Sequence, residues 1–281
     1  MIRPHLNPLS APPGRDPEEA DSAAGEGLPR LFSSLTLYQD IDSRSGALNM
    51  AIDETLLEIA SAPTIRFYRW NHPALSFGYF GKFDDVADQK DEREIVRRWT
   101  GGGIVFHGED LTYSIVIPAN DPVFANFSKA IYEKTHTAIC MALVANGQRA
   151  ELAGPSTFNI DSRSPDRSVA SPGDQCSPSD GFPARRIQPS TFNAPCFANP
   201  VRSDVLLNGR KVAGAAQRRT RRGLLQQGSI QNVDLGERFG CRFASELSNN
   251  WKVERVSDAL LARAQAIAGK KYLTPAWLGR R

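Results

Sequence analysis

Two short segments of this sequence combine residue types that suit the binding and transfer of a carbonyl-containing group. The first spans 97–107 and reads RRWTGGGIVFH. Its candidate substrate-binding residues are Arg98, Gly101, Gly102, Gly103 and His107. Consecutive glycines let the backbone approach a bound group closely, and exposed N–H groups there can hold an anion or a carbonyl oxygen. A bare glycine triplet is typical of a hairpin turn, and a lone histidine of a structural hydrogen bond, but the arginine pair beside them favours a binding site.

The second segment spans 204–218 and reads DVLLNGRKVAGAAQR. Lys211 lies next to a hairpin signal, and the small residues Gly214 and Ala215 after it leave room for a ligand. Cys196 precedes this lysine by 15 residues. A nearby ammonium lowers the pKa of a thiol and can stabilise an oxyanion. Taken singly, Lys211 is more typical of a solvated surface and Cys196 of a small buried residue. Together they describe a thiol nucleophile and its electrostatic partner.

The composition is that of an ordinary soluble protein and excludes several classes. The chain has 281 residues, of which 41% are hydrophobic and 23% charged, and its net charge of +3 is too small for a general nucleic-acid binder. No stretch approaches the roughly 20 apolar residues of a membrane helix, and the N-terminus lacks the apolar region of a secretory signal.

The cysteines point to free thiols rather than to a metal site. They are Cys140, Cys176, Cys196 and Cys241. No pair has the spacing of zinc ligands, so we expect no metal, and in a reducing cytoplasm the thiols stay free. We therefore expect a cytoplasmic protein in which one thiol can act as a nucleophile.

The spacing of apolar residues and the positions of Gly, Pro and polar turn residues predict the helices and strands that position these residues. Helices are predicted at 46–61, 128–146 and 256–268, the first with a cap at Ser45. Strands are predicted at 64–70, 75–78, 95–99, 103–106, 111–117, 204–208, 212–216 and 224–233. This order indicates an α+β fold with a mixed, mainly antiparallel sheet and flanking helices. Residues 1–34 are predicted to be a disordered tail, and 35–281 a single domain.

One segment breaks this pattern. Residues 155–195 are rich in Ser, Pro, Asp and Arg, and the pentapeptide PSTFN at 155–159 recurs at 189–193. Deleting 160–193 leaves one copy and a short loop. Because the composition and the repeat agree, we interpret these 34 residues as an insertion into a surface loop rather than as a chance repeat.

The two segments resemble the hallmarks of a known superfamily. Residues 97–107 resemble the RRxxGGGxVxH motif of lipoate–protein ligases and octanoyltransferases, a superfamily that also includes biotin ligases, and 208–217 (NGRKVAGAAQ) resembles its lysine strand. Supporting matches are NMAIDE at 49–54 and LTYS at 111–114. The resemblance runs from about residue 36 to the end without the insert. It implies a biotin/lipoate protein ligase-like catalytic domain whose substrate-binding residues include Gly78.

Cys196-Phe197 resembles the Cys-Phe dipeptide of the cysteine-dependent octanoyltransferases. This resemblance implies that Cys196 takes an octanoyl or lipoyl group from acyl carrier protein as a thioester. A lysine of a lipoyl-accepting protein, such as glycine cleavage H protein or an E2 lipoyl domain, then receives the group while Lys211 stabilises the tetrahedral intermediate. No cofactor is expected, because the donor thioester stores the activation energy.

Two departures from the family pattern keep alternatives open. Gly108 stands where the motif usually has Asp, and Gly81 where Gln often follows a Gly-Tyr-Phe sequence. An ATP-dependent lipoate–protein ligase, using ATP and Mg²⁺ with an incidental Cys196, is one alternative. A non-catalytic acyl- or carrier-binding member is another, whereas a biotin ligase leaves the Cys196–Lys211 pair without a role.

Four arginines follow the lysine strand: Arg218, Arg219, Arg221 and Arg222. Such a run is usually a solvated face. We interpret it as a docking patch for acidic carrier or lipoyl domains. Nucleic-acid binding would explain the same charges, but the run has no interleaved aromatic residues.

Overall fold

The computed structural model describes residues 30–40, 42–154, 199–236 and 238–280. Within these ranges, eight strands form a mixed sheet in the order β11-β1-β2-β6-β10-β9-β8-β7, and three form a small sheet in the order β4-β3-β5. The strands are β1 Leu35–Gln39, β2 Thr64–Tyr68, β3 Ala74–Phe77, β4 Glu94–Arg97, β5 Val105–His107, β6 Leu111–Pro118, β7 Ala150–Leu152, β8 Val205–Leu207, β9 Arg210–Arg219, β10 Gly223–Ile230 and β11 Trp251–Glu254. The helices are α1 Gly46–Ile59, α2 Ser128–Val144, α3 Phe239–Leu247, α4 Asp258–Ile267 and α5 Pro275–Leu278.

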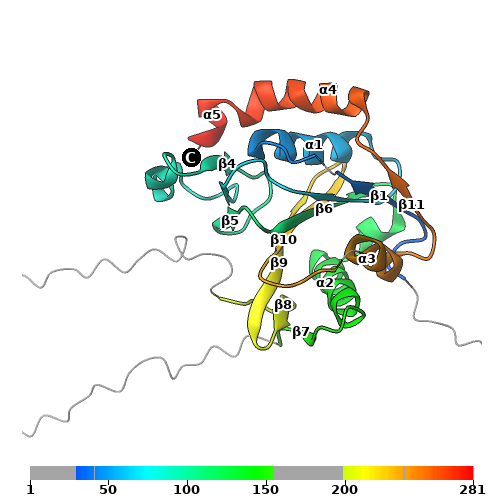
Figure 1. The fold of residues 1–281 in the computed structure, drawn as a ribbon. Coiled ribbons are helices and arrows are strands. Elements are labelled where there is room, and N and C mark those ends of the chain that lie inside the picture. Colours follow the sequence, from blue (N-terminus) through cyan, green and yellow to red (C-terminus); the bar gives the residue numbers. More distant parts are fainter. Residues whose placement is uncertain (1–29, 41, 155–198, 237, 281) are drawn as a thin grey trace, which may run out of the picture.

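Most neighbours in the large sheet are antiparallel, which confirms the predicted α+β class. Strand β1 pairs in parallel with β2 and β11. In the order β6, β10, β9, β8 and β7, each strand is antiparallel to the next. Helices cover both faces: α1 and α4 lie on one side of the sheet and α2 and α3 on the other (Figure 1). Every residue of β10 is buried, so the middle of the sheet lies between two apolar layers.

Helix α1 begins where the sequence predicts. The Ser45 side chain accepts a hydrogen bond from the Leu48 N–H, which satisfies one of the unpaired donors of the first turn. The buried face of α1 also carries two polar residues, Asn49 and Asp53. Asp53 accepts hydrogen bonds from Arg66 and Tyr68 on β2, so α1 is fixed on the sheet by polar as well as apolar contacts.

The hairpin before the lysine strand also forms as predicted. Asn208 and Gly209 have φ angles of +51° and +74°, and two positive φ values are the requirement of the tightest hairpin turn. The turn joins β8 to β9. Lys211 is the second residue of β9, so its position is set by strand pairing rather than by a loop.

The structure differs from the sequence expectations at the chain ends. We predicted a tail through residue 34, but Phe32 is 2% exposed within the main core, so that boundary was wrong for residues 30–34. Residues 1–29 lie outside the described part. Helix α3 and strand β11 were not predicted, because each is short and depends on contacts with distant segments: α3 with α2, and β11 with β1.

Described residues on the two sides of the segment 155–198 lie next to each other. The Ala153 N–H donates to the Asp204 carbonyl (2.8 Å), and the Ser203 N–H donates to the Ala153 carbonyl (2.9 Å). The proposed insertion at 160–193 lies outside the described residues. The two hydrogen bonds join Ala153, just before the segment, to Ser203 and Asp204 after it, a geometry that a short loop could also connect.

We predict that deleting residues 160–193 leaves the fold intact. The deletion keeps ten residues between Gly154 and Asn199, enough to connect neighbouring chains, and the entropic cost of closing a loop depends only weakly on its length. Thermal unfolding should then give a Tm within a few degrees of the full chain. A same-length Gly/Ser replacement of 160–193 serves as the control, and loss of soluble, folded protein in the deletion alone would refute the interpretation.

Candidate functional site

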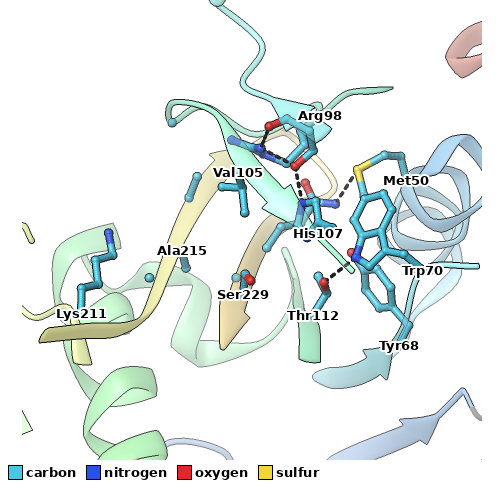
Figure 2. A pocket seen from close by; sticks show the side chains of 16 residues that line it. Met50, Tyr68, Trp70, Arg98, Val105, His107, Thr112, Lys211, Ala215 and Ser229 are labelled. Atoms are coloured by element: carbon cyan, nitrogen blue, oxygen red, sulfur yellow. Dashed lines mark hydrogen bonds between the residues drawn. The ribbon is translucent and has the colours of Figure 1, made fainter. Parts of the chain in front are cut away.

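A narrow cleft with a cavity volume of about 60 Å³ lies where β3, β5, β6, β9 and β10 meet. Lys211 lies at one end of the cleft, and Met50, Tyr68 and Trp70 lie at the other (Figure 2). An ammonium at one end and apolar side chains at the other suit a ligand with a polar head and an aliphatic chain.

Lys211 is held by a buried carboxylate. Its Nζ lies 2.8 Å from Asp204 Oδ2, and the two side chains are 7% and 0% exposed. The lysine lies directly over Gly214: a Cβ at that position would be 2.5 Å from Lys211 Cε and 2.7 Å from Nζ. The glycine therefore provides the space in which the lysine side chain itself lies, whereas the sequence analysis expected that space to hold a ligand.

Asp204 joins three segments of the chain. Besides Lys211 on β9, it accepts from the Tyr132 hydroxyl on α2 (2.5 Å) and from the Val201 N–H (2.7 Å). The Tyr132 hydroxyl also accepts from the Ala215 N–H (3.2 Å). The chain that follows Cys196 is thus anchored beside Lys211 from Val201 onward. Cys196 itself lies outside the described residues.

Arg98 fixes the glycine turn, residues 101–103. Its Nη2 donates to the carbonyl oxygens of Gly101 (3.1 Å) and Gly103 (2.7 Å), and its Nη1 to the Ser76 carbonyl (2.7 Å). Gly102 has φ +87°, a conformation that favours glycine. A Cβ on Gly78 would lie 2.0 Å from the Gly102 carbonyl oxygen, so the turn is packed against β3 through glycine on both sides.

His107 is buried and hydrogen-bonded at both ring nitrogens. Its Nδ1 lies 2.8 Å from Asp110 Oδ2 and its Nε2 2.6 Å from Ser76 Oγ, while its ring stacks on Trp70 with centroids 4.0 Å apart. Burial lowers the pKa of His107 below its ordinary value despite the carboxylate. His107 therefore contributes to the wall of the cleft and has no free nitrogen for direct hydrogen bonding to a ligand.

A second buried histidine supports the anchored segment. His136 on α2 donates from Nδ1 to the Ser203 carbonyl (2.6 Å) and accepts at Nε2 from the Tyr113 hydroxyl (3.0 Å). Burial lowers the pKa of His136 to about 4, so its ring is uncharged at neutral pH. It was not predicted from the sequence, because its partners are 23 and 67 residues away.

The structure brings most of the predicted site residues together. Lining the cleft are Arg98, Gly102, His107, Lys211, Gly214 and Ala215. Gly78, Gly101 and Gly103 shape the turn behind this wall instead. Sequence reasoning missed Ser76, Asp110 and Asp204 as partners. A signal existed for the last two, since each is an acidic residue within seven positions of a predicted site residue.

The four arginines do not form one uniform surface. Arg218 is half-buried between Tyr79 and Trp99, with its Cζ 4.5 and 4.8 Å from the ring centroids. Arg219 donates to two backbone carbonyls near the start of α2, and Arg222 pairs with Glu58. Arg219, Arg221 and Arg222 are exposed, so the docking prediction now concerns these three.

The described part of the chain shows neither a metal cluster nor a membrane helix. No three of its His, Cys, Asp and Glu side chains are grouped so that they could hold a metal ion. None of its helices is long and apolar enough to cross a bilayer.

Comparison with known proteins agrees with this geometry. Residues 45–252 match the model of the lipoyl protein ligase A/B catalytic domain. A Macrococcus caseolyticus protein named octanoyltransferase LipM is 31% identical over 78% of this chain and 73% of its own length. One of the same name from Carboxydothermus hydrogenoformans is 36% identical over 69% of this chain and 63% of its own length. This chain thus matches less than two thirds of several such relatives.

Solved structures show the same fold at low identity. A T. acidophilum protein described as a lipoate protein ligase, with bound lipoic acid, has a TM-score of 0.60. It is 17% identical, and the match covers 88% of this chain and 98% of that one.

We predict that Gly214→Ala displaces Lys211 from Asp204. The new methyl group would overlap the lysine side chain, and overpacking of this kind typically costs about 1–3 kcal/mol. Urea unfolding should show the lower free energy of unfolding, and mass spectrometry should show faster acetylation of Lys211. Gly101→Ala is the control, because no atom lies within 4 Å of a Cβ there. Equal acetylation rates in Gly214→Ala and the native protein would contradict the prediction.

We also predict acid destabilisation through His136. Since its pKa falls from the ordinary 6.5 to about 4 on folding, the unfolded chain binds the extra proton between these pH values. The contribution to stability is complete above pH 6.5 and is lost as the pH falls toward 4, by roughly 3 kcal/mol in all. Urea unfolding between pH 7.5 and 4.5 measures it. His136→Gln should be less stable at pH 7.5 but show a flatter pH dependence; equal slopes would exclude His136 as the cause.

Proposed function

This chain belongs to the lipoyl protein ligase A/B catalytic domain family, and we propose that it is an octanoyltransferase of lipoate biosynthesis. In this proposal it moves an octanoyl group from a thioester donor to a lysine of a lipoyl-accepting protein. The observation that carries the proposal is the cleft, which has an ammonium at one end and an apolar wall at the other. The relatives named octanoyltransferase, at 31% and 36% identity, support the same activity.

Cys196 is the proposed nucleophile. Its thiolate attacks the thioester carbonyl of octanoyl-acyl carrier protein, a tetrahedral intermediate forms, and the carrier thiol leaves with a proton. The acceptor lysine amine then attacks the Cys196 thioester, an amide bond forms, and the Cys196 thiol is released. Support comes from Asp204, which fixes both Lys211 and the chain five residues after Cys196.

Lys211 is proposed to stabilise the oxyanion in both steps. Its pairing with Asp204 fixes the direction of the ammonium, so little reorganisation is needed when charge develops on the carbonyl oxygen. The N–H groups of the glycine turn supply further donors at the same cleft. The octanoyl chain would extend from Lys211 toward Met50, Tyr68 and Trp70.

The proposed reaction needs neither metal nor nucleotide, because the donor thioester already carries the activation energy. The acceptor would be glycine cleavage H protein or an E2 lipoyl domain, in the cytoplasm. The described cysteines, Cys140 and Cys241, are free thiols. An ATP-dependent lipoate ligase remains the second candidate, because the solved structures of this fold include one with bound ATP.

The first test is the intact mass of the protein after mixing with octanoyl-acyl carrier protein without ATP. We expect an octanoyl adduct that is absent in Cys196→Ala and retained in Cys241→Ala, a matched change at a partly exposed free cysteine. No adduct, together with acceptor modification only when octanoate or lipoate, ATP and Mg²⁺ are supplied, would identify a ligase instead. Binding of acyl groups without any turnover would identify a non-catalytic member.

The second test concerns the exposed arginines. Changing Arg221 and Arg222 to Glu should slow transfer from the carrier protein roughly tenfold at low salt, because opposite charges speed encounter with an acidic partner. The difference should shrink at high salt, where charges are screened. Arg263→Glu is the control, since Arg263 is also exposed and pairs with the same Glu58. Unchanged rates at low salt would remove the docking role.

A further inference from the structure

Hydrogen bonds run from Asp110 through three side chains to the glycine turn. Asp110 Oδ2 lies 2.8 Å from His107 Nδ1, and His107 Nε2 lies 2.6 Å from the Ser76 hydroxyl oxygen. Arg98 Nη1 donates to that oxygen at 2.6 Å. The same guanidinium holds two carbonyl oxygens of the glycine turn. We call these four side chains the relay (Figure 2 labels Arg98 and His107).

Asp110 fixes the directions of the two hydrogen bonds that His107 makes, whereas Arg98 can only donate. Burial opposes ionisation of Asp110, but donors from His107, Ser229 and Thr112 hold its pKa below the ordinary value. A carboxylate only accepts, so His107 carries its proton on Nδ1. Its Nε2 must then accept from Ser76, whose oxygen accepts in turn from Arg98.

Burial makes the relay depend on all its members. Ser76 is 0% exposed, Asp110 and His107 are each 5% exposed, and Arg98 is 6% exposed. Water therefore cannot readily replace a missing partner, and an unsatisfied buried donor or acceptor is costly. Gly108, which stands where the family motif has Asp, donates its N–H to Asp110 Oδ1 (3.1 Å).

The far end of the relay determines how the glycine turn faces the cleft. Carbonyl and N–H groups of a trans peptide point in opposite directions. When Arg98 holds the carbonyl oxygens of Gly101 and Gly103, it also fixes the N–H directions of Gly102 and Ile104. Gly102 lines the cleft, so the relay sets the orientation of a backbone donor at the binding surface.

We propose that Asp110 and Ser76 are positioning residues, which act through His107 and Arg98 to orient the glycine turn toward the acyl carbonyl. This inference rests on the proposed acyl transfer. The order Ser76, His107, Asp110 also matches a nucleophile, its base and an orienting carboxylate. Ser76 is assigned to positioning rather than to attack, because it is fully buried and its oxygen already accepts from a guanidinium.

The first measurement is the tautomer of His107 by ¹⁵N NMR. The native protein should show a proton on Nδ1, and Asp110→Asn should move it to Nε2, since an amide can donate where the carboxylate accepted. The amide signals of Gly102 and Ile104, at the other end of the relay, should shift as well. A tautomer that stays on Nδ1, or glycine-turn signals that do not move, would overturn the proposal. These readings need no turnover, so they remain decisive even if the protein transfers no octanoyl group.

The second measurement is a double-mutant cycle on octanoyl transfer. Asp110→Asn and Ser76→Ala should each lower kcat about tenfold or more with KM within about threefold, because only the orientation of the turn changes. The double variant should lose no more than the more severe single variant, as expected for residues that act as one unit. Additive losses, or unchanged kcat in either single variant, would overturn the proposal.

Ser248→Ala is the matched control for Ser76→Ala. Ser248 is also 0% exposed and makes two hydrogen bonds, but it pairs with Asn250 at the end of α3 and not with the cleft. It should lower stability without changing kcat. If Asp110→Asn does not fold, Ser76→Ala alone still tests the proposal, which predicts a lower kcat and a shifted Gly102 amide signal for this variant. An octanoyl adduct on Ser76 in a Cys196→Ala background would show attack by Ser76 and overturn the positioning role.

Discussion

The carboxylate of Asp204 is the constraint on which the site depends. It is fully buried and accepts from a helix, from a strand lysine and from the backbone of the chain that leads back to Cys196. A buried charge is tolerated only when its partners are complete, and removing one typically costs several kcal/mol. The position of Lys211 is therefore not adjustable: α2, β9 and the segment at Val201 must all be in place before the carboxylate is satisfied.

The same logic recurs at two other buried acids around the cleft. Asp53 on α1 accepts from Arg66, Tyr68, Ser114 and Gln227, which lie on three different strands. Asp110 accepts from His107 on β5 and from the N–H of Gly108. It also accepts from Thr112 on β6 and from Ser229 on β10. Each carboxylate thus links elements that are far apart in sequence. Apolar packing brings the layers together, while these acids fix the relative positions of the strands that form the cleft.

The local features of the site could be predicted from the sequence, but few of its long-range contacts could. The cap at Ser45 and the hairpin at Asn208 are consequences of neighbouring residues, and both were predictable. The space at Gly214 was predicted to hold a ligand, but the Lys211 side chain lies in it. Arg98 was predicted to bind substrate; it lines the cleft, and its hydrogen bonds to Ser76 and to the glycine turn were not predicted. Hydrogen bonds such as the one between Asp204 and Tyr132 join residues 72 positions apart, and no local sequence pattern predicts them.

The hydrogen bonds that join Ala153 to Ser203 and Asp204 bear on whether the fold needs a continuous chain. They close the sheet across the segment 155–198, so strands on either side of it are held by pairing rather than by the intervening peptide. Strands β6 and β10 belong to opposite sides of this segment and pair along eight residues, as β1 and β11 pair at the sheet edge. A single cut within 155–198 would therefore leave two fragments that remain associated as one fold. The protein is in effect two complementary halves, and this is a natural position at which to divide it into a split reporter.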